Sequence, residues 1–184
     1  MNYKNIFSLF VGLVFLLNVN GQEAKTRKEI RAQKKADLLL KNDSVRQIQE
    51  QWAANKTFVL EAQQVYNKIG EVFQLSPSLN FVYFNLEEAV VQLSFNGIVG
   101  WNGVGGITIK GRITKYEYEA DNKNIPIYIE ATIQGQEGFQ DILVWISTNG
   151  NGEAQVTDLR GNRLKFTGEV VSLEQSRVFM GTQR

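Results

Sequence analysis

The hydrophobic pattern of the chain changes near residue 56, from one typical of a helix to one typical of strands. Residues 23–56 are rich in Ala, Lys, Gln and Leu and contain neither Gly nor Pro, which favours a helix. Beyond Asn55, β-branched and aromatic residues alternate with polar ones, and turn residues recur about every ten positions. The pattern therefore predicts a charged helical segment at 22–56 and a β-rich domain at 57–184.

The predicted helix has a short apolar face, because basic residues occupy the same side further upstream. We expect only its later part to dock on a core. Ser44 and Gln47 have the spacing of a capping box, so we also expect a break or kink near residues 41–43. The apolar side chains that share one side are Leu38, Val45, Ile48 and Trp52.

The β-rich domain contains strands with two kinds of pattern. Residues 125–133 place an apolar residue at every second position, as expected of a half-buried strand. Residues 141–147 are apolar on both faces, so we expect a second layer over them, with the N-terminal helix as the cover. Residues 176–184 are expected to pair at a sheet edge. About eight strands joined by hairpins, without βαβ alternation, predict an antiparallel β-sandwich or a closed β-barrel with one N-terminal α-helix.

Residues 89–114 form two apolar runs around a glycine-rich connection. Gly111 lies inside the second run, which indicates close approach of a neighbour or a bend. The isoleucines of this run and Tyr116 beyond it have opposite parity, so a β-bulge is predicted near Thr114 or Lys115.

The tip of this connection carries the candidate ligand-binding residues Trp101 and Asn102. A tryptophan ring at a loop tip can stack on a sugar or on a partner; the alternative is that it folds back over the end of the sandwich or barrel. The connection lacks the glycine spacing of a phosphate-binding loop and leads into a strand instead of a helix.

The first 21 residues have the three parts of a secretory signal peptide. Lys4 supplies a positive charge, residues 6–17 are almost wholly apolar, and residues 19–21 are compact. We expect cleavage after this segment, a periplasmic or secreted product, and no membrane span in the mature chain; an uncleaved N-terminal anchor is the alternative. The apolar run is not followed by a cysteine that could be lipidated.

Composition removes several classes of chemistry. The chain has no cysteine and no histidine, which excludes thiolate nucleophiles, thiolate metal sites and imidazole proton transfer. The formal net charge of +1 is unevenly distributed, with +4 at residues 23–56 and −4 at residues 57–184. Mixed charge on the helix favours a solvated face over a membrane or nucleic-acid surface, and an acidic β domain also disfavours nucleic acid.

Four runs resemble one known family: FVLEA at 58–62, AVVQLSFNG at 89–97, GVGGITIKGRIT at 103–114 and FTGEVVSLEQSRVFMG at 166–181. They are similar to the secreted Bacteroidetes proteins grouped as domain of unknown function 4251. The resemblance implies a cell-envelope or periplasmic setting in a Gram-negative bacterium. It implies no catalytic residue, because no activity is assigned to that family.

These patterns predict an exported, non-enzymatic binding or interaction module of the cell envelope. In the more specific form of this prediction, the module holds a small apolar ligand inside a barrel; the other candidate partner is an envelope protein. One alternative is a carboxylate-dependent hydrolase of envelope glycans, which needs two acids across a cleft; another is a subunit of an envelope assembly. We assign no catalytic residue, metal ligand or cofactor, since most acidic residues lie in predicted turns or outward positions.

Overall fold

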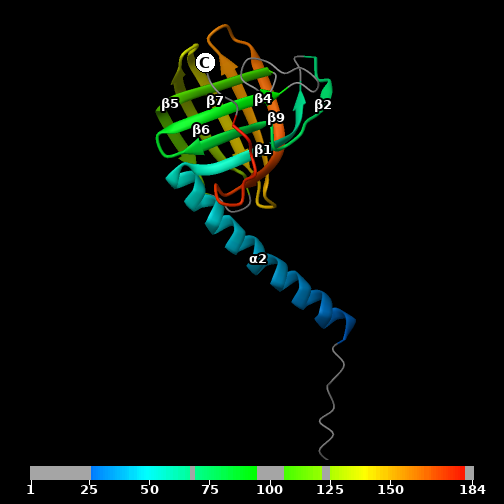
Figure 1. Cartoon of the computed structure of the whole chain (residues 1–184). Helices are drawn as coiled ribbons and strands as arrows, with labels where there is room; N and C mark the ends of the chain where they lie inside the picture. The colour runs from blue at the N-terminus through cyan, green and yellow to red at the C-terminus, as the bar shows by residue number, and fades with distance from the viewer. Residues whose placement is uncertain (1–25, 67–68, 95–105, 122–124, 181–184) are drawn as a thin grey trace, which may run out of the picture. The chain divides into compact units, whose positions relative to one another are not determined.

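The computed structural model describes residues 26–66, 69–94, 106–121 and 125–180, so the predicted signal peptide lies outside the described residues. A single helix in this part of the chain, α2 (Arg27–Asn55), precedes nine strands (Figure 1). The strands are β1 (Thr57–Tyr66), β2 (Val72–Gln74), β3 (Phe81–Asn85), β4 (Glu88–Ser94), β5 (Gly106–Glu119), β6 (Ile127–Gly135), β7 (Gly138–Ile146), β8 (Asn151–Asp158) and β9 (Arg163–Val171).

Eight of these strands close into an antiparallel β-barrel. Strands β3 to β9 each pair with their neighbours in sequence, and β1 pairs with β3 along one edge and with β9 along the other. The three-residue β2 pairs with β1 at Gln64 to Tyr66, beyond β3, and is additional to the closed ring. Of the two predicted architectures, the structure is the closed barrel, in which the ring has no unpaired edge.

Inward-facing residues from all eight ring strands form one core. The predicted alternation is confirmed on β6 from Ile127 onward, where Ile127, Ile129 and Ile133 are fully buried. Ile125 precedes the strand and is 54% exposed. The inward positions of β7 carry Ile142, Val144 and Ile146.

The expectation that the helix covers the second face of β7 is wrong. Leu143 and Trp145, which occupy that face, are half-buried, and Leu38 and Ile48 of the helix are exposed. A closed barrel buries one face of each strand inside itself, so it needs a cover at its end instead of on its side. The last turns of α2 supply that cover, with Trp52 and Ala53 packed against the barrel core.

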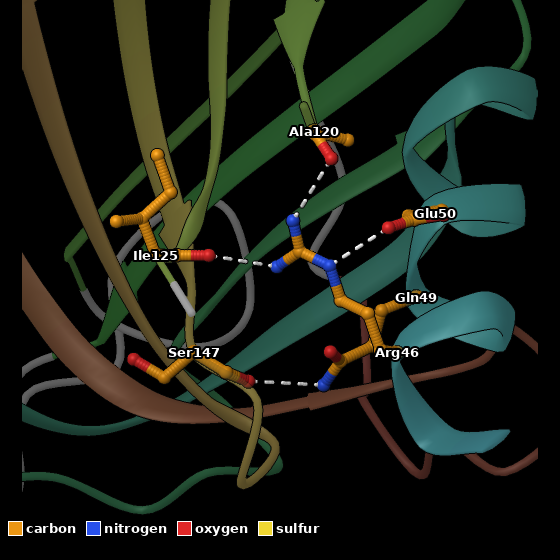
Figure 2. Close-up of polar contacts among 6 residues, drawn as sticks. All are labelled: Arg46, Gln49, Glu50, Ala120, Ile125 and Ser147. Carbon is orange, nitrogen blue, oxygen red and sulfur yellow. Dashed lines mark hydrogen bonds and ion pairs between the residues drawn. The ribbon is translucent and has the colours of Figure 1, made fainter. Parts of the chain in front are cut away.

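Polar residues of α2 bind the strand ends at the helix-covered end (Figure 2). Arg46 is 1% exposed, and its guanidinium donates to the carbonyl oxygens of Ile125 and Ala120 at 3.0 and 3.4 Å. It also pairs with Glu50 at 2.8 Å. Gln49 Nε2 donates to the Ser147 carbonyl oxygen at 3.1 Å. Two loops, the one between β5 and β6 and the one between β7 and β8, are thereby held to one helix.

The predicted break near residues 41–43 is also wrong, since α2 is continuous. Ser44 Oγ donates to the Leu40 carbonyl oxygen at 3.0 Å, as a serine inside a helix commonly does. The capping box lies at the true start of the helix. There Thr26 N donates to Glu29 Oε2 at 2.7 Å and Glu29 N donates to Thr26 Oγ1 at 3.3 Å.

The two predictions for β5 are confirmed. The pairing of β5 with β6 shifts register between Ile113 and Lys115, which is the expected bulge. A Cβ atom placed on Gly111 would lie 2.9 Å from the Gln134 carbonyl group, so only glycine fits without a shift of the backbone.

Residues 172–180 form a strap across the outside of β1, β3 and β4, instead of pairing at a sheet edge. Leu173 and Val178 of the strap pack against a small outer cluster made of Val59, Phe81 and Val90. Gln92 Nε2 donates to the Phe179 carbonyl oxygen at 2.9 Å. The strap explains why β4 is buried on both faces.

Candidate functional site

A cavity of about 930 Å³ lies at the end of the barrel that α2 does not cover, and we call it the open-end cavity. This end is formed where β4 and β8 finish and where β5, β7 and β9 begin. The volume lies within the range of small-molecule sites, which are mostly apolar with a few placed polar groups. The apolar wall consists of Val91, Leu93, Ile107, Ile109, Val156 and Leu164.

Gln140 is the polar residue within this wall. It shares the inward parity of Ile142 and Val144 on β7 and is 2% exposed. Its Oε1 is buried and has no hydrogen-bond partner in the described residues. A buried acceptor without a donor costs about 1–3 kcal/mol, which a ligand with an N–H or O–H group would offset.

The loop between β8 and β9 forms one side of the mouth and is held in shape by Asp158. The Asp158 carboxylate accepts hydrogen bonds from Arg160 N at 2.9 Å, from Asn162 N at 2.8 Å and from Asn162 Nδ2 at 2.8 Å. The bonds from Asn162, the side-chain bond first, hold the pKa of Asp158 below its ordinary value. Asp158 is therefore an ionised acceptor that organises a turn.

The mouth of the cavity is lined by charged residues, whereas its wall is apolar. Arg160, Arg163 and Glu137 join Asp158 in lining the cavity. Leu159 lies above Gly138, since a Cβ atom placed there would be 2.7 Å from Leu159 Cδ1. The arrangement suits a ligand with an apolar body that enters the barrel and a polar part that stays at the rim.

The predicted ligand residues Trp101 and Asn102 lie outside the described residues, so their prediction stays untested. The strands that flank them do reach the site, because Leu93 near the end of β4 and Ile107 near the start of β5 both line the cavity. Sequence reasoning missed Gln140. The available signal was one polar residue at an inward position of β7.

The described residues also bear on two other kinds of site. They contain no group of three or more acidic side chains arranged to hold a metal ion. In the same residues, no helix combines the length and the apolar character that crossing a membrane requires.

A solved structure resembles this chain. It is the crystal structure of a DUF4251 family protein from Bacteroides eggerthii DSM 20697, with 26% sequence identity and a TM-score of 0.61. The match covers 76% of this chain and 93% of that one. A search of curated proteins finds no match. The family model described as "Domain of unknown function (DUF4251)" matches residues 39–170, and the chain therefore belongs to this family.

Proposed function

We propose that this protein is an exported, non-enzymatic binding module of the bacterial cell envelope, and that it holds a small amphipathic ligand in the open-end cavity. The observation that carries the proposal is Gln140, a buried acceptor without a described partner in an otherwise apolar wall. The ligand has an apolar body, which the wall accommodates, and one N–H or O–H group that donates to Gln140 Oε1.

Export rests on the pattern of the first 21 residues and on the family resemblance. Fractionation of the native host tests this part of the proposal. We expect the protein in the periplasmic fraction or the medium, with an N-terminus near residue 22 by mass spectrometry. Recovery of the full-length chain from the cytosol would contradict export, and recovery of the full-length chain in membranes would favour the uncleaved anchor.

The non-enzymatic character rests on the chemistry that the chain can offer. It has neither cysteine nor histidine. Among the described residues, the carboxylates that line the cavity are those of Glu137 and Asp158, and a glycosidase needs one acid whose pKa is raised. The pKa of Asp158 is lowered instead, by its hydrogen bonds to Asn162 and Arg160. Turnover of envelope glycans that is lost in Glu137→Gln would favour the hydrolase alternative.

A pair of fluorescent probes tests the cavity and Gln140 together. N-phenyl-1-naphthylamine is apolar and has one N–H donor, whereas 1-phenoxynaphthalene has the same shape with an ether oxygen in its place. We expect both probes to bind, the amine about fivefold more tightly, since a neutral hydrogen bond contributes about 1 kcal/mol. Fluorescence titration gives the two dissociation constants.

The variant Gln140→Leu should bind the two probes equally, because it retains the apolar wall and lacks the acceptor. It should also unfold at an unchanged or higher denaturant concentration, since an unpartnered buried acceptor is replaced by an apolar group. The matched control is Gln134→Leu, an exposed position on the neighbouring strand β6, which should preserve the preference for the amine. Equal affinities in the wild type, or an undiminished preference in Gln140→Leu, would contradict the role of Gln140.

The assembly alternative makes a different prediction, namely that a host protein co-purifies. Trp52 is unsuited to test it by substitution, because Trp52 packs against the barrel core and its loss would weaken the fold. An exposed helix residue such as Ile48 is the appropriate position. Stoichiometric co-purification that Ile48→Asp abolishes would favour a subunit of an assembly.

A further inference from the structure

A second hollow, of about 640 Å³, lies on the outer surface of the barrel over β7, β8, β9 and β1. Its side chains face away from the core and include the aromatic residues Trp145 and Tyr66. Gly152 and Gly168 also line it. The hollow is separate from the open-end cavity, with which it shares no lining residue among those described.

Strand register places its main side chains in one row. Trp145 pairs with Glu153, Glu153 pairs with Thr167, and Thr167 pairs with Gln64. Tyr128 of β6 extends the row beyond Trp145, with ring centroids 5.6 Å apart and ring planes at 49°. Trp145 is thus held by a neighbour while remaining half-buried at the edge of the hollow.

The polar groups of the row are oriented by one another. Gln64 Oε1 accepts hydrogen bonds from Tyr66 Oη at 3.2 Å and from Thr167 Oγ1 at 3.3 Å. Lys165 Nζ lies 5.5 Å from the centroid of the Tyr66 ring. These contacts reduce the side-chain freedom that a ligand would otherwise have to remove.

Glu153 is the charged residue of the row, and its charge is neutralised by Lys165, which lies beside the hollow. Lys165 Nζ and Glu153 Oε1 form an ion pair at 2.8 Å, with both side chains more than a third exposed. A charged ligand would have to compete with one member of this pair. A neutral ligand with many hydroxyl groups can hydrogen-bond to Glu153 without separating the ion pair.

We propose that this outer hollow binds a neutral oligosaccharide, with the apolar face of one pyranose ring on Trp145. Aromatic side chains combine a large apolar face with fixed geometry, which suits the flat face of a sugar ring. Gln64, Glu153 and Thr167, which line the hollow, offer both donors and acceptors to its hydroxyl groups. The site is independent of the cavity proposal, because it uses the opposite face of the strands.

Isothermal titration with chitotetraose, cellotetraose and mannotetraose tests the proposal. We expect saturable binding of at least one of them, with a dissociation constant on the order of 1 mM or lower. Trp145→Ala should weaken that binding at least about fivefold. Phe139→Ala is the matched control, since Phe139 is an exposed aromatic residue on the same outer face of β7 but away from the hollow, and it should bind as the wild type does.

Glu153→Gln separates a neutral ligand from a charged one. It leaves Lys165 without its partner while keeping a planar hydrogen-bonding group. Affinity for the neutral tetrasaccharide should change less than about threefold, while affinity for tetragalacturonate should rise. Trp145→Ala should retain the folded circular-dichroism spectrum and the naphthylamine affinity. Absence of saturable binding by all three neutral sugars up to about 10 mM, or unchanged binding in Trp145→Ala, would overturn the proposal.

Discussion

Gln140 and Tyr116 are both polar residues associated with the barrel core, but only one of them has its polar atom paired. Tyr116 Oη donates to the Ala53 carbonyl oxygen at 2.6 Å, which ties β5 to the end of α2. Gln140 Oε1, at the other end of the barrel, has no partner in the described residues. Because Gln140 also lines the cavity, we interpret Tyr116 as structural and Gln140 as the residue that binds the proposed ligand.

The paired tyrosine predicts a loss of stability in alkali. Burial raises the pKa of Tyr116 well above its ordinary value. An unfolded tyrosine ionises near pH 10, so above about pH 10 only the unfolded state releases this proton. Each further pH unit should lower the free energy of unfolding by about 1.4 kcal/mol, with no effect of this residue below that range.

Tyr116→Phe removes the ionisable hydroxyl group and with it this pH dependence of the free energy of unfolding. Urea denaturation at about pH 9 should show the variant less stable by about 1–2 kcal/mol, because the bond to Ala53 is lost. The difference should shrink between about pH 10 and pH 11, as the wild type loses stability that the variant never had. Tyr83→Phe, on the outer face of β3, is the control and should follow the wild type across this range. A difference that stays constant with pH would contradict the assignment.

At the scale of elements, the contact between α2 and the strand ends depends on a charged residue. Arg46 has an exposed fraction of 1%, and its guanidinium donates hydrogen bonds to two backbone carbonyl groups, those of Ile125 and Ala120 (Figure 2). Burial of a cation is expensive unless it is fully paired, so the loss of the guanidinium should also be costly.

Arg46→Met should lower the free energy of unfolding by about 2–4 kcal/mol, because the Ile125 and Ala120 carbonyl groups lose a charged donor. The neighbouring Gln47→Met is the matched control, since Gln47 is exposed on the same turn, and it should change stability by less than about 0.5 kcal/mol. Urea denaturation at neutral pH measures both. Equal stability of the two variants would contradict the role given to Arg46.

Elements defined by local sequence were predictable, and elements defined by distant contacts were not. Alternation on β6, the bulge after Ile113 and the close approach at Gly111 each depend on a few neighbouring residues. The helix was mispredicted in two respects, for different reasons: the break was expected because Ser44 and Gln47 match a capping box inside a continuous helix, and the position of the cover was wrong because it depends on distant contacts. Its cover of the barrel end relies on Arg46 and Gln49 bonding to loops some 70 to 100 positions later, which a search for an apolar face cannot detect.

At the scale of the whole barrel, closure decides where ligands can bind. Closure requires β1 to pair with β9, as in the pairing of Val59 with Val171, and no local pattern distinguishes this from an open sandwich. Once the barrel is closed and one end is covered by α2, the remaining end provides the way into its interior. From the sequence, the cavity could be predicted only on the condition that the sheet closes into a barrel. Gln140 could be identified as one of its lining residues only once the inward-facing positions of β7 were known.

Native mass spectrometry of the protein purified from the envelope fraction of its own host tests the central claim most directly. We predict a population with one additional small-molecule mass, released on activation, and its loss in Ile109→Trp, where the indole would fill the cavity. Lys110→Trp places the same side chain at the adjacent exposed position and should retain the bound mass. Repeated recovery of the bare protein under conditions that preserve a bound naphthylamine, or equal retention of the ligand by Ile109→Trp, would contradict the account.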